Sequence, residues 1–118
     1  MQLRNVVVVD GMRSAFGRGG RGKLVATRLD DAAAKVVRTL LDRHPKLPEH
    51  WIEDFGIGNV AGHGEWNYLG TVPRLAGLPL EVNTFNSNRQ CGSSMETMHR
   101  IAMAIMTGSM DGGIAMGR

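Results

Sequence analysis

The only cysteine of the chain, Cys91, is the residue whose surroundings best fit covalent chemistry. Gly92, Ser93 and Ser94 follow it, and then comes a long segment with apolar residues at helical spacing. The first N–H groups of a helix have no partner inside the helix, and the helix dipole is positive there. A thiolate is favoured at such a position, and it is a better nucleophile than a thiol. Cys91 is therefore a candidate nucleophile for acyl transfer, with small neighbours that let an acyl group approach.

Acyl transfer to a thiol also needs a base within hydrogen-bond reach, and the sequence offers no good candidate. His99 lies eight residues further along the predicted helix. At about 1.5 Å per residue this places it roughly 12 Å away. His44 and His50 flank a polar turn, and His63 lies in a glycine-rich loop, where a solvated histidine is the commoner case. From the residues alone, a buried and unreactive cysteine remains an alternative to the nucleophile.

Several other classes of function find little support in the sequence. A lone cysteine cannot form an internal disulfide, and no second Cys or His stands at ligand spacing from it, so no metal site is expected. The net charge is only +3, and a basic loop over residues 12–23 is a weak basis for nucleic-acid binding. The glycines of that loop match G-x-G-x-x-G, but they begin well after the preceding predicted strand ends. No apolar run is long enough to span a membrane, and no signal-peptide pattern is present.

The elements that would position Cys91 alternate between strands and helices. Val6–Val9 is an unbroken β-branched run, which predicts a strand buried on both faces. Apolar spacing predicts an amphipathic helix over 27–43 with Thr27 as its N-cap. Further along, we predict a strand over 55–60, a short helix over 71–76, a strand ending at 84–86, a helix over 93–107 and a strand over 111–116. This order indicates a layered α/β fold whose methionine-rich helix over 93–107 is central and largely buried.

The residues around Cys91 resemble the nucleophile motif of the thiolases, the acyl-CoA C-acyltransferases. From Val82 the chain reads VNTFNSNRQCGSSMETMHRIAMAIMTGSMDGG. The segments VVVVDGMRSAFGR, IEDFGIGNV and RLAGLPLEV also stand in the order of that family, so the resemblance covers essentially the whole chain. It implies that residues 1–118 form an incomplete thiolase N-terminal domain. The implied fold is α/β, with α-β-α layers, a mixed sheet and a central buried helix.

The resemblance also implies an activity and its participants. Cys91 would be the catalytic nucleophile, acylated while a 3-ketoacyl-CoA is cleaved to acetyl-CoA and a shortened acyl-CoA in fatty-acid β-oxidation. CoA would be a co-substrate, with no bound cofactor or metal, and the residues that bind CoA stay unassigned. The implied partners are a second copy, as a homodimer or tetramer, and the hydratase/dehydrogenase subunit of β-oxidation, in the cytoplasm, without nucleic acid or a membrane span. Asn88 and Arg89 match family residues that shape the turn before the cysteine.

Three departures from the thiolase pattern bear on activity. The 67–70 segment lacks the arginine of the family's N-x-A-R, and 116–118 crowds a position where thiolases have paired glycines. The family's catalytic histidine and second cysteine would lie beyond Arg118, so the chain alone is expected to be inactive. Two alternatives remain open: a related condensing enzyme of the ketoacyl-synthase type, and a non-catalytic assembly module that pairs with a full-length thiolase.

Overall fold

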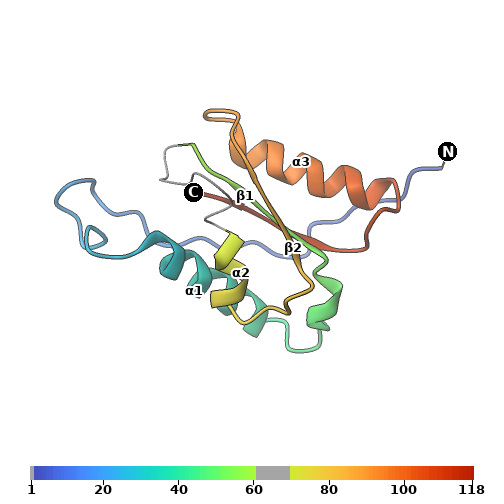
Figure 1. Cartoon of the computed structure of the whole chain (residues 1–118), viewed down its shortest axis with the longest axis horizontal. Coiled ribbons are helices and arrows are strands. Elements are labelled where there is room, and N and C mark those ends of the chain that lie inside the picture. Colours follow the sequence, from blue (N-terminus) through green and yellow to red (C-terminus); the bar gives the residue numbers. More distant parts are fainter. Residues whose placement is uncertain (1, 61–69) are drawn as a thin grey trace.

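A parallel sheet lies between two helical layers in the computed structural model, which describes residues 2–60 and 70–118 (Figure 1). The strands are β1 (Asp54–Gly58), β2 (Asn83–Ser87) and β3 (Gly113–Gly117), in the order β2-β1-β3. The helices are α1 (Leu29–Asp42), the 3₁₀ helix η1 (Glu49–Trp51), α2 (Thr71–Leu75) and α3 (Ser93–Met106). The helix α3 covers one face of the sheet, and α1 and α2 cover the other. The predicted layered α/β architecture is confirmed, although the described strands pair only in parallel.

The central strand β1 sends different side chains to its two faces because successive residues of a strand alternate. Phe55 and Ile57 are buried in the hydrophobic core on the side of α1 and α2. Val37 and Leu41 of α1 contribute to the same core, which confirms the predicted apolar stripe of that helix. The core therefore lies mainly between the sheet and the α1–α2 layer.

The other face of the sheet is lined by glycines, and α3 lies directly on them. A methyl group added at Gly58 would overlap the backbone of Ser93 and Ser94 at the start of α3. One added at Gly117 would overlap the side chain of Ser94. Gly58 and Gly117 end β1 and β3, so the start of α3 is held against the carboxyl ends of two parallel strands.

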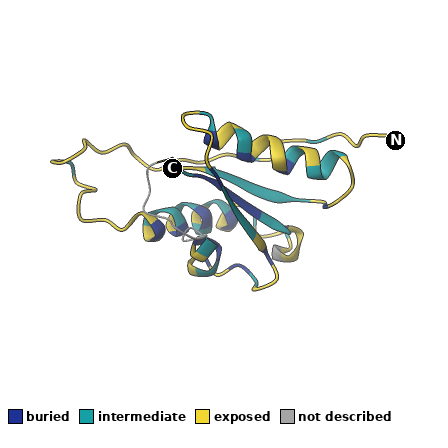
Figure 2. Ribbon diagram, turned by 45° about the horizontal axis from the view of Figure 1, so that its top comes forward, coloured by how far each residue is buried: buried dark blue, intermediate teal, exposed yellow. Residues whose placement is uncertain are grey.

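The run Val6–Val9 is not a strand, and the prediction that it is buried on both faces is wrong. The segment belongs to no sheet, and Val8 is 78% exposed. In Figure 2 this part of the chain is coloured almost throughout as exposed. The physical reason is that strand propensity needs a neighbouring strand for its backbone hydrogen bonds. No described strand lies directly beside residues 6–9, because a groove separates this segment from β3.

The helix α3 is also less buried than predicted. Thr97 and Ile101 are buried against the sheet, but Met95 and Met103 are exposed on the opposite side. Apolar residues nearly all round the helix suggested burial on every side, whereas the described part of the chain covers only one side (Figure 2).

The start of α1 differs from the prediction by two residues. The helix begins at Leu29, with Arg28 rather than Thr27 at the N-cap position. Arg28 pairs with the buried carboxylate of Asp30, at 2.6 Å, which ties the entry of the helix to its first turn. The basic loop before it is exposed, as a surface loop should be.

Replacing Gly58 with Ala is expected to destabilise the chain by about 1–3 kcal/mol, because the new methyl group forces α3 away from the sheet. Urea denaturation measures this as a lower free energy of unfolding. Gly11→Ala is the matched control, since a methyl group there meets no atom within 4 Å. Equal stability of the two variants would contradict the close approach of α3 to β1.

Candidate active site

Cys91 lies in the turn between β2 and α3, and its side chain is exposed. The alternative of a buried cysteine is therefore wrong. The residue before it, Gln90, has φ of 50°, in the left-handed region that side-chain-bearing residues seldom adopt. Such a conformation costs on the order of 1–3 kcal/mol and persists only where neighbouring contacts impose it. The contacts of this turn therefore decide how the thiol is presented.

Three hydrogen bonds between side chains and the backbone hold Gln90 and its neighbours in this turn. The N–H of Gln90 donates to Asn88 Oδ1 at 3.1 Å, a local turn that asparagine favours. The hydroxyl of Ser93 donates to the carbonyl of Gln90 at 2.6 Å and accepts from the N–H of Arg89 at 2.8 Å. Ser93 thus links both sides of the left-handed residue to the start of α3.

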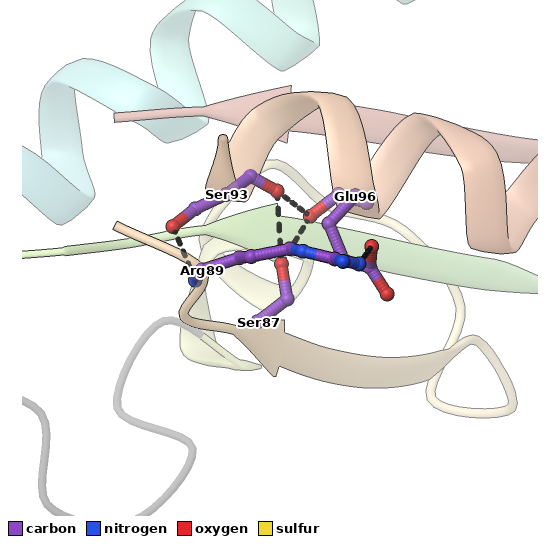
Figure 3. Close-up of polar contacts among 5 residues, drawn as sticks. Ser87, Arg89, Ser93 and Glu96 are labelled. Atoms are coloured by element: carbon purple, nitrogen blue, oxygen red, sulfur yellow. Dashed lines mark hydrogen bonds and ion pairs between the residues drawn. The ribbon is translucent and has the colours of Figure 1, made fainter. Parts of the chain in front are cut away.

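A buried hydroxyl cluster fixes the start of α3 to the end of β2. Ser87 Oγ lies 2.7 Å from Thr97 Oγ1 and donates to the carbonyl of Ser93 at 3.0 Å. Thr97 Oγ1 also lies 3.0 Å from that carbonyl oxygen. Each hydroxyl has one proton, so when Ser87 donates to the carbonyl, Thr97 donates to Ser87. All three residues are buried, so the loss of one partner would leave a polar group unsatisfied in the interior. Figure 3 shows Ser93 joined both to Ser87 and to Arg89.

An ion pair spans the turn on its outer side. Arg89 Nη1 lies 2.6 Å from Glu96 Oε2, and Glu96 is in the first turn of α3 (Figure 3). Because Arg89 is exposed, this pair is worth little by itself. Together with the Ser93 contacts, it holds the segment before Cys91 against the helix that follows.

The turn leaves backbone donors beside the thiol. Inside α3, the first N–H to find a helical acceptor is that of Glu96, which bonds the carbonyl of Gly92. Helix geometry leaves the N–H groups of Ser94 and Met95 without an acceptor within the helix. Gly92 carries no side chain to cover them. The site therefore combines an exposed thiol, small neighbours and the positive end of a helix, which is a suitable arrangement for binding an oxyanion.

Residues 6–118 match the family model described as "Thiolase, N-terminal domain". The chain belongs to the thiolase family. The 3-ketoacyl-CoA thiolase of Vibrio parahaemolyticus serotype O3:K6 is 40% identical over 112 residues, 93% of this chain and 29% of the relative. The 3-ketoacyl-CoA thiolase of Shewanella loihica is 37% identical over 111 residues, 92% of this chain and 29% of the relative.

A solved structure has the same fold. The dimeric peroxisomal thiolase of Saccharomyces cerevisiae superimposes with a TM-score of 0.79 at 26% identity, over 86% of this chain and 27% of that one. The thiolase-like fold expected from the motif is therefore confirmed. The chain spans less than a third of the length of these relatives.

The described histidines of this thiolase-family chain are not gathered around Cys91. His44 pairs instead with Asp10 at 2.7 Å, and His50 follows the polar turn before β1. His99 is exposed on α3, two turns beyond the cysteine. The remaining candidate base, His63, lies outside the described residues. So do residues 67–69, which belong to the segment that lacks the arginine of the family's N-x-A-R. No base for the thiol is assigned within the described ranges.

Within residues 2–60 and 70–118, no group of three or more His, Cys, Asp or Glu side chains is placed to hold a metal ion. None of the described helices combines the length and apolar character needed to cross a bilayer.

The sequence predicted the thiol and its turn but missed the residues that position them. Ser87, Ser93 and Thr97 form a buried cluster whose spacing gives no recognisable motif, because the contacts join different elements. A signal did exist for the glycines. Gly56 and Gly58 alternate with apolar residues in β1, a pattern typical of a strand on which another backbone lies closely.

Replacing Ser93 with Ala is expected to destabilise the chain by about 1–3 kcal/mol, since the Arg89 N–H and the Gln90 carbonyl both lose a partner. Urea denaturation gives the change, and the alkylation rate of Cys91 reports the loosened turn. Ser94→Ala is the matched control, because that neighbouring serine is exposed and alanine suits a helix. If both variants unfold at the same urea concentration, Ser93 does not hold this turn.

Proposed function

We propose that this chain carries the nucleophilic part of a thiolase, with Cys91 as the residue that becomes acylated. The observation behind the proposal is the exposed thiol on a constrained left-handed turn at the N-terminus of α3. The family to which the chain belongs supports a thiol nucleophile at this place. Thiolase chemistry is favoured over the ketoacyl-synthase alternative because the relatives described above are thiolases by name.

In the proposed reaction, the Cys91 thiolate attacks the keto carbon of a 3-ketoacyl-CoA. The carbon–carbon bond next to that carbonyl breaks, and its electron pair goes to the departing acetyl-CoA carbon, which takes up a proton. The shortened acyl group stays on the sulfur as a thioester until the thiol of a second CoA accepts it. In this proposal, backbone N–H groups at the start of α3 bind the transient oxyanion.

The proton transfers need an acid and a base that this chain's described residues do not supply. We therefore propose that the chain alone is an incomplete catalyst, and that residues 1–118 act as one part of a larger thiolase site. The finer assignments follow the relatives and stay proposals: β-oxidation as the setting, CoA as co-substrate, a homo-oligomer, and association with a hydratase/dehydrogenase subunit. The relative from Saccharomyces cerevisiae is dimeric by its own description, which supports the homo-oligomer.

Cys91 is expected to react with iodoacetamide at pH 7 about tenfold faster than glutathione, because its thiol is exposed beside the positive end of the α3 dipole. Mass spectrometry of the quenched reaction gives the rate and the site. The same chain in 8 M urea is the control, since unfolding removes the helix but keeps the thiol. A folded chain that alkylates no faster than the unfolded one would contradict the proposed nucleophile.

The purified chain is expected to show no CoA-dependent cleavage of acetoacetyl-CoA, because its described residues place no acid or base beside Cys91. Loss of absorbance of the acetoacetyl-CoA enolate measures the reaction, and a relative such as the Vibrio parahaemolyticus enzyme serves as the positive control. Sustained turnover by the chain, abolished by Cys91→Ser, would show that the acid/base groups are present after all.

A further inference from the structure

The loop that precedes α1 projects from the molecule as an arm, which we define as residues 11–27 (Figure 1). Every residue of the arm is exposed except Gly22, which is half-buried. The N–H of Gly22 donates to the carbonyl of Arg18 at 2.7 Å, and a methyl group added at Gly22 would overlap the backbone of Arg18. Residues 18–22 therefore form a closed turn whose side chains lie in solvent.

The arm carries four positive charges and no negative one. Its cations are Arg13, Arg18, Arg21 and Lys23, and residues 11–29 contain no Asp or Glu. None of the four side chains forms an ion pair with a described residue. The net charge of the whole chain is only +3, so the positive charge is concentrated in this arm. A surface of one sign attracts partners of the opposite sign.

Apolar side chains lie among these charges. Phe16 is 91% exposed, the largest value for a large apolar residue in the described part of the chain. The guanidinium of Arg13 lies over its ring, 5.2 Å from the centroid, so a cation and an aromatic ring are presented together. A methyl group added at Gly17 would lie 3.2 Å from Leu24, so the two limbs of the arm approach each other next to Phe16. Leu24 and Val25, on the second limb, are exposed as well.

This combination of unpaired cations and exposed apolar side chains limits the kind of partner. The centre of a protein interface is depleted in charged residues, because unpaired charges are costly to remove from water. Single-stranded nucleic acid would use the cations and the ring, but not aliphatic side chains such as Leu24 and Val25. Inorganic phosphate would use the cations alone. An anionic lipid bilayer uses both kinds of group, since its headgroups attract cations and its interface accepts apolar side chains.

We propose that the arm is a membrane-docking element, whose cations hold the chain at an anionic lipid surface while Phe16, Leu24 and Val25 enter the interface. One such attraction gives only marginal membrane binding, whereas an apolar group and a basic patch together hold a protein at the surface. The inference rests on the charge and exposure of the arm, and it does not depend on the chemistry of Cys91. Because the arm contributes no residue to the buried core, substitutions in it should leave the fold intact.

Flotation of lipid vesicles with the full chain tests the proposal, since bound protein rises with the vesicles and aggregated protein sinks. Vesicles of phosphatidylcholine alone are compared with vesicles that contain about 30% phosphatidylserine. The chain should bind the anionic vesicles at least about tenfold more tightly than the neutral ones. Raising the salt concentration from about 0.05 M to about 0.5 M should weaken this binding about tenfold, because salt screens exposed charges.

Two lysine substitutions test whether the arm supplies the attraction. Lys23→Gln should weaken binding to the anionic vesicles about fivefold, because it removes one charge that lies close to the headgroups. Lys46→Gln is the matched control, since it removes the same charge from an exposed lysine beyond the other end of α1. The 14 residues of α1 separate Lys46 from the arm by about 20 Å, so binding should change less than about twofold.

Two apolar substitutions test whether the arm enters the lipid. Phe16→Ser should weaken binding to the anionic vesicles about tenfold, because the ring no longer leaves water. Leu80→Ser is the matched control, since that side chain is 80% exposed and lies outside the arm, and binding should change less than about twofold. Circular dichroism of each variant checks that the fold is kept.

Three outcomes would overturn the inference. In the first, the chain binds neutral and anionic vesicles equally, or binds neither. In the second, Phe16→Ser binds the anionic vesicles as tightly as Leu80→Ser, so that no side chain of the arm enters the lipid. In the third, the chain binds a single-stranded oligonucleotide more tightly than the vesicles and Lys23→Gln weakens that binding, which would assign the arm to nucleic acid.

Discussion

The close contact of α3 with the glycine-lined face of the sheet is the constraint on which the rest of the structure depends. Gly58 and Gly117 end neighbouring parallel strands, and neither leaves room for a side chain beneath the start of the helix. The helix can therefore begin only at the carboxyl edge of the sheet. This fixes where the turn after β2 must pass, and with it the position of Cys91.

Around that contact, hydrogen bonds between polar groups fix β2, α3 and the turn that joins them. The Ser87–Thr97 pair and the Ser93 carbonyl join β2 to α3 in the interior, and the Ser93 hydroxyl continues the link to Gln90. These bonds stabilise a left-handed residue directly before the thiol. A strained residue at a reactive group is a common way to fix its direction, because the surrounding contacts offset the cost.

The exposed valines of the 6–9 segment and the outer edge of β3 lie on opposite sides of a groove. A sheet edge and a β-branched segment face each other across a gap, each with backbone groups that no described strand satisfies. The methionines on the outer side of α3 are exposed in the same way. The chain spans less than a third of the length of the relatives described above.

The sequence by itself determined the α/β class, the stripe of α1, the strand–turn–helix around Cys91 and, through its motif, the thiolase family, because these depend on local periodicity and on a specific run of residues. The burial predicted from the sequence was wrong for Val6–Val9 and for the outer side of α3. Burial depends on which elements pack against a segment, and the residues of the segment do not determine that. Only the tertiary structure brought Ser87, Ser93 and Thr97 together and placed Gly58 under the helix. Such contacts join residues from separate elements, and their geometry exists only after the helix has docked on the sheet.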